Sequence, residues 1–199
     1  MDVFEALNTT RAMRRLDPDR DVSDADLLTI VEAATKAPSG GNNQPVRWMV
    51  VRDPERRTRL GAIYRECWLP IHDMYQATAQ SPDMERVLNS ADHLGDHMGD
   101  APAIIIPCSK DAPGFGEASV YGAVQNLFLA ARALGLGTTL TTVHRFREPE
   151  VRAVLGIPDD VTTWAMIPVG YPLGRWGEAK RRPVREVTYW DSWNAAAPD

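Results

Sequence analysis

The segment from Glu117 to Leu134 constrains the fold of this 199-residue chain more than any other feature. Apolar side chains recur in it at the spacing of an α-helix and cover most of its circumference: Val120, Tyr121, Val124, Leu127, Phe128, Ala130, Ala131 and Leu134. A helix this apolar is buried on most sides, so other elements have to cover it. Gly135 follows at the position where a left-handed residue ends a helix.

The bulk composition sets the class of protein. With 44% apolar residues the chain can build a core, and its length predicts one domain spanning residues 1–199. No run approaches the roughly 20 apolar residues that cross a bilayer, and the N-terminus lacks the apolar stretch of a signal peptide. Cys67 and Cys108 are far apart and are expected to be free thiols in a reducing cytoplasm. A net charge of −5 argues against nucleic acid as the main partner.

Caps, prolines and apolar periodicity predict the remaining elements. Ser23 followed by Asp26 is a capping-box pattern that starts a helix. Pro70 and Pro82 should break the helices around them, and Pro107 should close its strand or place it near a sheet edge. The expected helices are 2–9, 23–37, one from 53–54, two or three in 60–100, and 148–155. The expected strands are 48–51, 103–108, 137–143 and 163–169.

The tail from Tyr171 onward contains no amphipathic helix. It is rich in Pro, Gly and Arg, and it ends in the aromatic residues Tyr189, Trp190 and Trp193. Such a tail cannot make a core of its own, so it should pack on another surface. In a small domain, we expect this surface to be a second subunit.

Basic residues gather at particular places although the chain is acidic overall. Arg11, Arg14 and Arg15 are either a solvated helix end, where cations favour the helix dipole, or a phosphate clamp. Arg181 and Arg182 in the tail are open to the same two interpretations. A local basic patch on an acidic protein suits one small anion better than a polymer.

The loop from Pro38 to Asn43 also has two interpretations. It either only connects a helix to a strand, or Ser39, Gly40 and Asn42 let backbone and short polar groups approach a flat ligand. The threonines of residues 137–143 fit a strand by their β-propensity.

The histidines and cysteines predict neither a metal site nor nucleophilic catalysis. His93 and His97 are four residues apart on a predicted helix, which suits either a metal or a solvated surface. No third ligand is identifiable. His144 and Cys108 have no visible triad partner. We therefore expect no metal ion and no catalytic side chain.

Four motifs follow one another along the chain: TRAMRRLDPD (10–19), APSGGNNQPVRW (37–48), ASVYGAVQNLFLAARALGLGTT (118–139), and IPVGYP (167–172) with AKRRPVREV (179–187) after it. In this order and at these separations they resemble the motifs of the FMN-dependent nitroreductase family. The counterparts there are an N-terminal arginine motif, a loop of the form APSxxNxQPWxF, a long core helix with its turn, and a closing strand with a basic tail. Each motif is weak alone, and the four together carry the resemblance.

The resemblance implies an α+β fold with a central mixed sheet flanked by helices, in an intertwined homodimer with two FMN sites built from both subunits. The residues implied at the flavin phosphate and pyrimidine edge are Arg11, Ala12, Met13, Arg14 and Arg15, with Arg14 or Arg15 at the ring. Those implied to come from the partner chain's loop are Pro38, Ser39, Gly40, Asn42 and Gln44. Those implied to offer backbone N–H groups near N5 and O4 are Thr141, Thr142 and Val143. Those implied to complete the phosphate site are Lys180, Arg181 and Arg182.

The activity that the resemblance implies is ping-pong reduction of small electrophiles, such as nitroaromatics or quinones, with NADH or NADPH. Reductive dehalogenation, enoate reduction, flavin breakdown and a non-catalytic flavin-binding dimer are the alternatives. Thr10 and Ala12 stand where the family often has Arg and Ser, and Val46 replaces a common Trp. The segment Ile63–Gly99, where family members line their substrate channel, matches no pattern that assigns a substrate.

Overall fold

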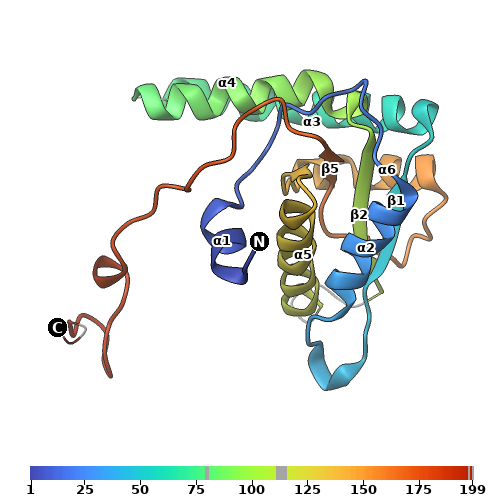
Figure 1. The fold of residues 1–199 in the computed structure, drawn as a ribbon. Coiled ribbons are helices and arrows are strands. Elements are labelled where there is room, and N and C mark those ends of the chain that lie inside the picture. The colour runs from blue at the N-terminus through green and yellow to red at the C-terminus, as the bar shows by residue number, and fades with distance from the viewer. Residues whose placement is uncertain (79–80, 111–115, 197, 199) are drawn as a thin grey trace.

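A computed structural model of the chain describes residues 1–78, 81–110, 116–196 and 198 (Figure 1). Its helices are α1 (Val3–Thr9), α2 (Asp24–Thr35), α3 (Pro54–Thr78), α4 (Pro82–His97), α5 (Glu117–Ala133) and α6 (Glu148–Leu155). Its strands are β1 (Arg47–Val51), β2 (Ala103–Ser109), β3 (Gly137–Thr138), β4 (Thr162–Thr163) and β5 (Ile167–Gly170). Short 3-10 helices are η1 (Gly40–Asn42), η2 (Met98–Asp100), η3 (Val143–Arg147) and η4 (Val184–Glu186).

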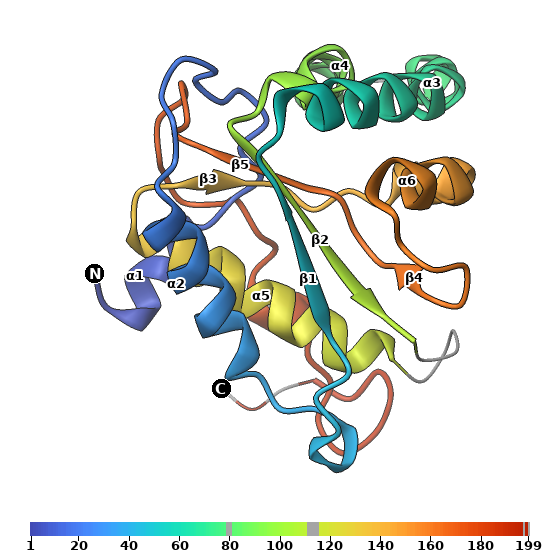
Figure 2. The same ribbon diagram turned by 90° about the vertical axis from the view of Figure 1, so that its right-hand side faces the viewer.

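The sheet lies between two groups of helices (Figure 2). Its strand order is β1-β2-β5-β3, and β4 pairs with the end of β2 that β5 leaves free. The ladders between the described strands are antiparallel, and a parallel bridge from Ala12 to Thr138 makes the sheet mixed. Helices α1, α2 and α5 lie on one side, and α3, α4 and α6 lie on the other. The predicted α+β fold is confirmed.

The central strand β2 explains why there are two buried clusters. Successive side chains of a strand point to opposite faces of the sheet. Ala103 and Ile105 therefore pack against α2 and α5, whereas Ile104 and Ile106 pack against α3, α4 and α6. All four side chains are fully buried, so β2 is covered on both faces.

The helices with clear caps form where the sequence predicts them. Ser23 caps α2 by accepting a hydrogen bond from the backbone N–H of Asp26 at 3.0 Å. The long apolar helix α5 ends at Ala133, and Gly135 adopts the left-handed conformation with φ +76°. The start of α2 and the end of α5 are therefore determined by local interactions, as expected for a cap residue and a terminal glycine.

The predicted helix break at Pro70 is wrong, because α3 continues through this residue to Thr78. Proline lacks the N–H that would bond to the carbonyl of Glu66. Both residues lie on the exposed side of the helix, so water can hydrogen bond to that carbonyl. The opposite side of α3 is buried, and its packing maintains the helix. The break at Pro82 is confirmed, since α4 begins there.

Three predicted strands differ from the structure. Pro107 lies inside the central strand rather than at an edge, because its carbonyl faces the gap between β4 and β5, where it accepts from Trp164 N–H at 2.9 Å. Its missing N–H faces the same gap, so the reciprocal hydrogen bond to Trp164 is not made, and the pairing passes there from β4 to β5. The strand predicted at 137–143 forms β3 at Gly137–Thr138, makes one further bridge from Thr141 to Met166, and then turns into η3. The strand predicted at 163–169 is interrupted and forms β4 and β5.

The two ends of the chain run side by side before the tail leaves the body (Figure 1). Residues 171–179 pair with residues 8–17 in the opposite direction through three backbone hydrogen bonds: Asp17 N–H to Tyr171 (2.8 Å), Leu173 N–H to Arg15 (3.0 Å) and Ala179 N–H to Asn8 (3.3 Å). Beyond this pairing the tail exposes 81% of Trp193, and α1 nearby exposes 72% of Phe4. The predicted second subunit would cover this apolar surface, and the homodimer stays a prediction.

No helix among the described residues combines the length and the apolar character that crossing a membrane requires.

Candidate active site

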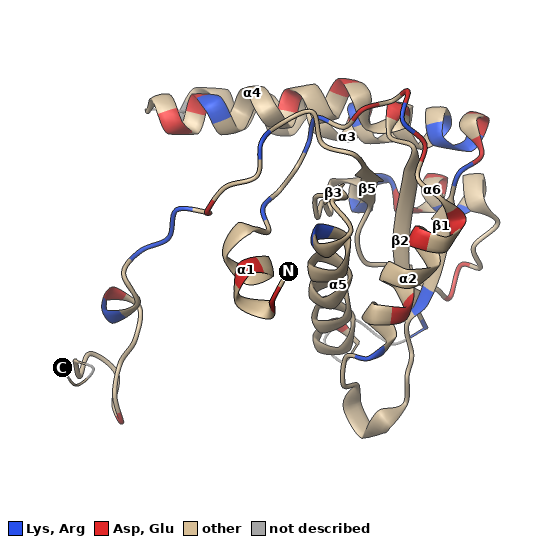
Figure 3. Ribbon diagram, viewed as in Figure 1, with Lys and Arg blue, Asp and Glu red and all other residues tan. Residues whose placement is uncertain are grey.

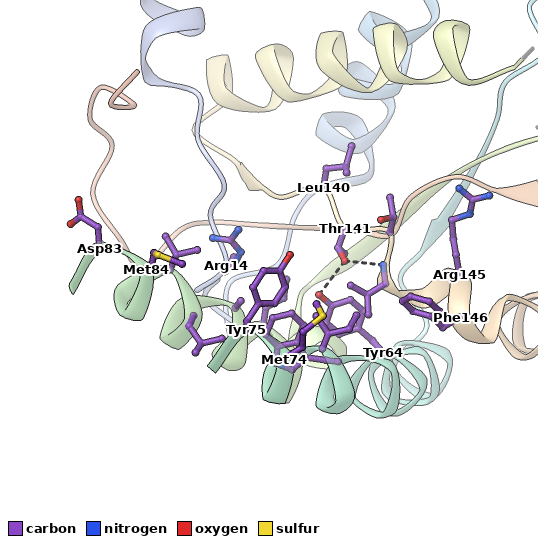
Figure 4. Close-up of a pocket in the computed structure, with 18 residues that line it drawn as sticks. Arg14, Tyr64, Met74, Tyr75, Asp83, Met84, Leu140, Thr141, Arg145 and Phe146 are labelled. Atoms are coloured by element: carbon purple, nitrogen blue, oxygen red, sulfur yellow. Dashed lines mark hydrogen bonds between the residues drawn. The ribbon is translucent and has the colours of Figure 1, made fainter. Parts of the chain in front are cut away.

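A cavity of about 920 Å³ lies between the α3–α4 pair and the segment that follows β3 (Figure 4). The helices supply a largely apolar and aromatic wall, which includes Tyr64 and Trp68 from α3 and Leu88 from α4. The facing wall is mixed, because it carries the polar groups of Arg14 and Thr141 beside apolar side chains. A concave apolar site with a few polar groups directed into it is the usual form of a cofactor or substrate site.

Arg14 reaches this cavity because the segment that carries it pairs with β3. The N–H of Met13 donates to the carbonyl of Thr138 at 2.9 Å, and Met13 is buried. Only glycine fits at position 137, since a Cβ there would lie 2.8 Å from the Cβ of Met13. Adjacent side chains of extended backbone point to opposite sides, so Arg14 faces the cavity. Burial lowers the pKa of the Arg14 guanidinium, which nevertheless remains a cation at neutral pH.

Thr141 connects the two walls of the cavity. Its carbonyl accepts from Met166 N–H at 2.8 Å, which holds the segment to the strand side. Its hydroxyl donates to the phenolic oxygen of Tyr64 at 3.1 Å and accepts from Val143 N–H at 3.4 Å (Figure 4). Burial raises the pKa of Tyr64, so its phenol is neutral and can accept this bond. The backbone from Thr141 to Val143 is therefore fixed at the cavity.

The loop from Pro38 to Gln44 lies at the opposite end of the chain's body (Figures 1 and 2). The N–H of Gly40 donates to the hydroxyl of Ser119, in the first turn of α5, at 3.3 Å. The cavity residues follow the other end of α5, which has 17 residues and therefore spans about 25 Å. The loop of one chain cannot reach the cavity of the same chain.

The loop holds an unusual backbone that Ser39 organises. Asn42 and Gln44 have φ of 55° and 48°, in the left-handed region that is costly for residues other than glycine. The hydroxyl of Ser39 accepts from Gln44 N–H at 3.0 Å, and its carbonyl accepts from Asn42 N–H at 2.9 Å. These bonds fix the exposed loop in one shape.

Comparison with known proteins identifies the family. The model of the nitroreductase family matches residues 7–171, which is most of the chain. The chain belongs to the nitroreductase family. It is 30% identical to a Methanothermobacter thermautotrophicus protein that carries the provisional name NADH dehydrogenase/NAD(P)H nitroreductase, over 86% of this chain and 78% of that protein. It is 28% identical to the iodotyrosine deiodinase of Thermotoga neapolitana, over 86% and 87% of the two chains.

The fold is found in solved structures of this family. A Desulfovibrio desulfuricans protein described as a nitroreductase in complex with FMN is 26% identical, with a TM-score of 0.74. The match covers 97% of this chain and 98% of that one.

Among the residues that the family resemblance suggested, Arg14, Thr141, Thr142 and Val143 line the same cavity. Arg15 is exposed and does not line it, so the structure distinguishes the two neighbouring arginines. Arg11, Ala12, Pro38, Ser39, Gly40, Asn42 and Gln44 also lie outside the cavity of their own chain, and Met13 is buried beside β3. Their contacts with a cofactor stay predictions.

The predicted phosphate residues lie on the two paired ends of the chain, where Figure 3 shows lysine and arginine along both segments. An added Cβ at Gly177 would lie 4.0 Å from a guanidinium nitrogen of Arg11. Lys180, Arg181 and Arg182 follow a few residues later and are exposed. They lie just beyond the pairing with residues 8–17, and an anion site shared with Arg11 stays a prediction.

The histidines and cysteines behave as structural groups. The rings of His93 and His97 lie 4.3 Å apart on α4, and the described residues contain no group of three or more metal-binding side chains. Cys67 and Cys108 are free and buried, as expected. His144 is fully buried, and its Nε2–H donates to Thr163 Oγ1 at 3.1 Å, while that hydroxyl donates to Glu148 at 2.8 Å. Burial lowers the pKa of His144 to about 4.

Sequence patterns alone did not assign the aromatic wall of the cavity. Tyr64, Trp68, Ile71 and Tyr75 line it at spacings of four, three and four residues along α3. This spacing indicates one face of a helix. It extends across Pro70, however, and an expected helix break at Pro70 divides it into two short segments that do not show the pattern. Tyr75 also stacks on Trp68, with ring centroids 6.4 Å apart.

Proposed function

We propose that this protein is an FMN-dependent oxidoreductase that takes hydride from NADH or NADPH and reduces small aromatic electrophiles, such as nitroaromatics or quinones, in a ping-pong cycle. It acts as one domain per chain, in a homodimer, in the cytoplasm. The observation that carries this proposal is that Arg14 and the backbone of Thr141–Val143 line one aromatic-walled cavity in a nitroreductase-family chain.

The residues at the cavity fit FMN in size and in chemistry. A volume of about 920 Å³ is at the upper end of the range for cofactor sites and leaves room for a second ligand beside the flavin ring. Arg14 forms no ion pair among the described residues, so its charge is free for an anionic group. FMN, when bound, supplies the exchange of hydride and electrons between the nicotinamide and the substrate.

The chain's own residues bind and orient rather than exchange protons. Arg14 would stabilise the negative charge that reduction places on the pyrimidine edge of the ring. The N–H group of Thr142 would donate to the ring near N5 and O4, since the hydrogen bonds of Thr141, one of which uses the N–H of Val143, hold this backbone in place. Arg11 with Lys180, Arg181 and Arg182 would hold the phosphate.

A complete site needs two copies of the chain. The loop from Pro38 to Gln44 is exposed and lies about 25 Å from its own cavity along α5. We propose that Ser39, Gly40 and Asn42 close the cavity of the partner subunit. The fixed, strained backbone of the loop supports this role, because such conformations concentrate at functional sites.

An absorbance spectrum of the purified protein, followed by titration with NADH and NADPH without oxygen, tests the proposal. We expect a yellow protein that one of the two reductants bleaches and that a nitroaromatic compound reoxidises. A colourless protein that cannot be reconstituted with FMN would contradict it.

Reductive dehalogenation is the second candidate, because identity to the deiodinase relative is nearly as high as to the nitroreductase-named one. The two candidates differ in the product. Incubating the reduced protein with 3-iodotyrosine should release iodide under the second candidate. Reoxidation by nitroaromatics without iodide release would favour the first.

A further inference from the structure

The cavity carries a second arginine that the proposed function leaves without a role. Arg145 lines the cavity from η3, two residues after Val143. Figure 4 shows its guanidinium well away from that of Arg14, with Thr141 between them. One arginine at the flavin ring therefore leaves the other available to a different ligand.

Arg145 is an exposed residue whose backbone N–H and guanidinium each have a contact in the structure. Its N–H donates to the carbonyl of Thr142 at 3.0 Å, and its guanidinium carbon lies 5.4 Å from the ring centre of Trp164. Trp164 is fully buried, and its indole N–H donates to the buried hydroxyl of Ser109 at 2.8 Å. A cation held over a rigid aromatic ring is oriented before a ligand arrives.

The charge at the cavity is unbalanced. Neither Arg14 nor Arg145 forms an ion pair with any described carboxylate, and the carboxylate at the rim, Asp83, is paired with Arg86. The remaining wall is apolar and aromatic, with Tyr64, Trp68 and Phe146. The net charge of the chain is −5, so this local positive charge is opposite in sign to that of the molecule.

We infer that the substrate is a planar aromatic molecule carrying a carboxylate, and that Arg145 recognises this carboxylate. The inference rests on the proposed function, since it names the substrate class of the same site. The aromatic wall holds the ring, and a guanidinium matches a carboxylate with two parallel hydrogen bonds. A neutral aromatic ester of the same shape has no carboxylate to accept these charge-assisted hydrogen bonds, so the site should bind the ester more weakly than the acid.

Binding of 4-nitrobenzoate and of its methyl ester tests the inference by isothermal titration calorimetry, with the purified, FMN-supplemented protein and no reductant. We expect the acid to bind at least about tenfold more tightly than the ester, and the difference to shrink in high salt. In Arg145→Gln the ratio of the two affinities should fall to near one. Arg145→Lys should keep part of it, because the charge remains but the planar fork does not.

Arg147→Gln is the matched control. It removes the same charge two residues further along η3, from a side chain that pairs with Glu66 and Glu150 and does not line the cavity. We expect it to change the ratio less than about threefold.

Equal affinity of the wild-type protein for acid and ester would overturn the inference, and so would a preference that survives in Arg145→Gln. A third contrary result would be that Arg145→Gln loses affinity for NADP⁺ but not for 4-nitrobenzoate. Arg145 would then bind the reductant rather than the substrate. Because the titration contains no reductant, it measures carboxylate recognition by Arg145 even in a protein without reductase activity. Failure of the inference is therefore distinguishable from failure of the proposed function.

Discussion

Arg14 and Arg15 show how far residue chemistry alone can locate a site. Both are arginines in the same basic motif, and no property of the sequence separates them. The pairing of Met13 with Thr138 separates them, because it directs Arg14 into the cavity and leaves Arg15 exposed. The residue type was predictable, whereas the direction depends on a contact with a segment more than 120 residues away.

Replacing Arg14 should change the redox behaviour of the bound flavin. The charge-assisted interaction between Arg14 and the reduced flavin ring is worth about 1.5–3 kcal/mol. Because its loss destabilises the reduced form, Arg14→Gln should lower the two-electron reduction potential of the flavin by about 30–60 mV. Arg15→Gln is the control and should leave the potential unchanged. Anaerobic titration against a reference dye measures both. Equal shifts in the two variants would contradict the assignment of Arg14.

His144 should make the protein less stable in acid. Its pKa is about 4 in the folded chain, against about 6.5 when unfolded, because burial disfavours the charged ring. The unfolded state therefore binds more protons between pH 6.5 and 4, and stability falls as the pH falls through this window. We expect a loss of about 3 kcal/mol, measured by urea unfolding at pH 7 and pH 4. His144→Gln should remove most of this slope, and a variant with an unchanged slope would refute the role of His144.

Among the helices and strands, the features that the sequence predicted well are those that local interactions determine. The cap at Ser23, the apolar stripe of α5 and the left-handed Gly135 are each readable within a few residues. The errors fall where distant contacts decide. The strand predicted after Gly137 is interrupted after Thr138, regains a single bridge to the distant Met166 at Thr141, and then turns into η3. Likewise, the aromatic wall of the cavity depends on α3 remaining one helix through Pro70.

The continuity of α3 can be tested at Pro70 itself. Pro70→Ala should restore a backbone hydrogen bond on the exposed side of the helix and raise the free energy of unfolding by about 1–3 kcal/mol. Pro82→Ala is the matched control, since proline suits the first position of a helix, and it should change stability by less than about 0.5 kcal/mol. Urea unfolding measures both. A loss of stability in Pro70→Ala would mean that the proline is needed for the shape of α3.

For the whole molecule, the site is divided between distant parts of the chain. Arg14 lies beyond one end of α5, and Gly40 contacts its other end. No single segment of the sequence reveals that Arg14 and Gly40 lie far apart, because their separation follows from the length of α5 and from the side of the sheet on which each residue lies. The basic, loop and helix motifs were recognisable in the sequence, whereas the distance between the loop and the cavity, on which the proposed two-subunit site depends, follows from the fold.

Subunit mixing tests the two-chain site. Arg14→Glu and Gly40→Trp should each abolish activity. A Cβ added at Gly40 meets nothing within 4 Å in its own chain and the loop is exposed, so the second variant should fold. After unfolding and refolding an equal mixture, half of the dimers combine both chains, and each of these contains one intact site. About a quarter of the wild-type activity should return in a steady-state assay. No recovery would place both residues in one subunit's site.

The antiparallel pairing of residues 8–17 with 171–179 also sets the order in which the protein is completed during synthesis. Residues 8–17 are made early, whereas their partners, Thr138 and the stretch after Tyr171, follow more than 120 residues later. At about 5–20 residues per second, this delay lasts roughly 8–30 s. Until then residues 8–17 lack their antiparallel partner, although α1 can already contact α5 once Arg132 has been made. Each nascent chain is therefore able to complete this pairing only after the stretch that follows Tyr171 has been made.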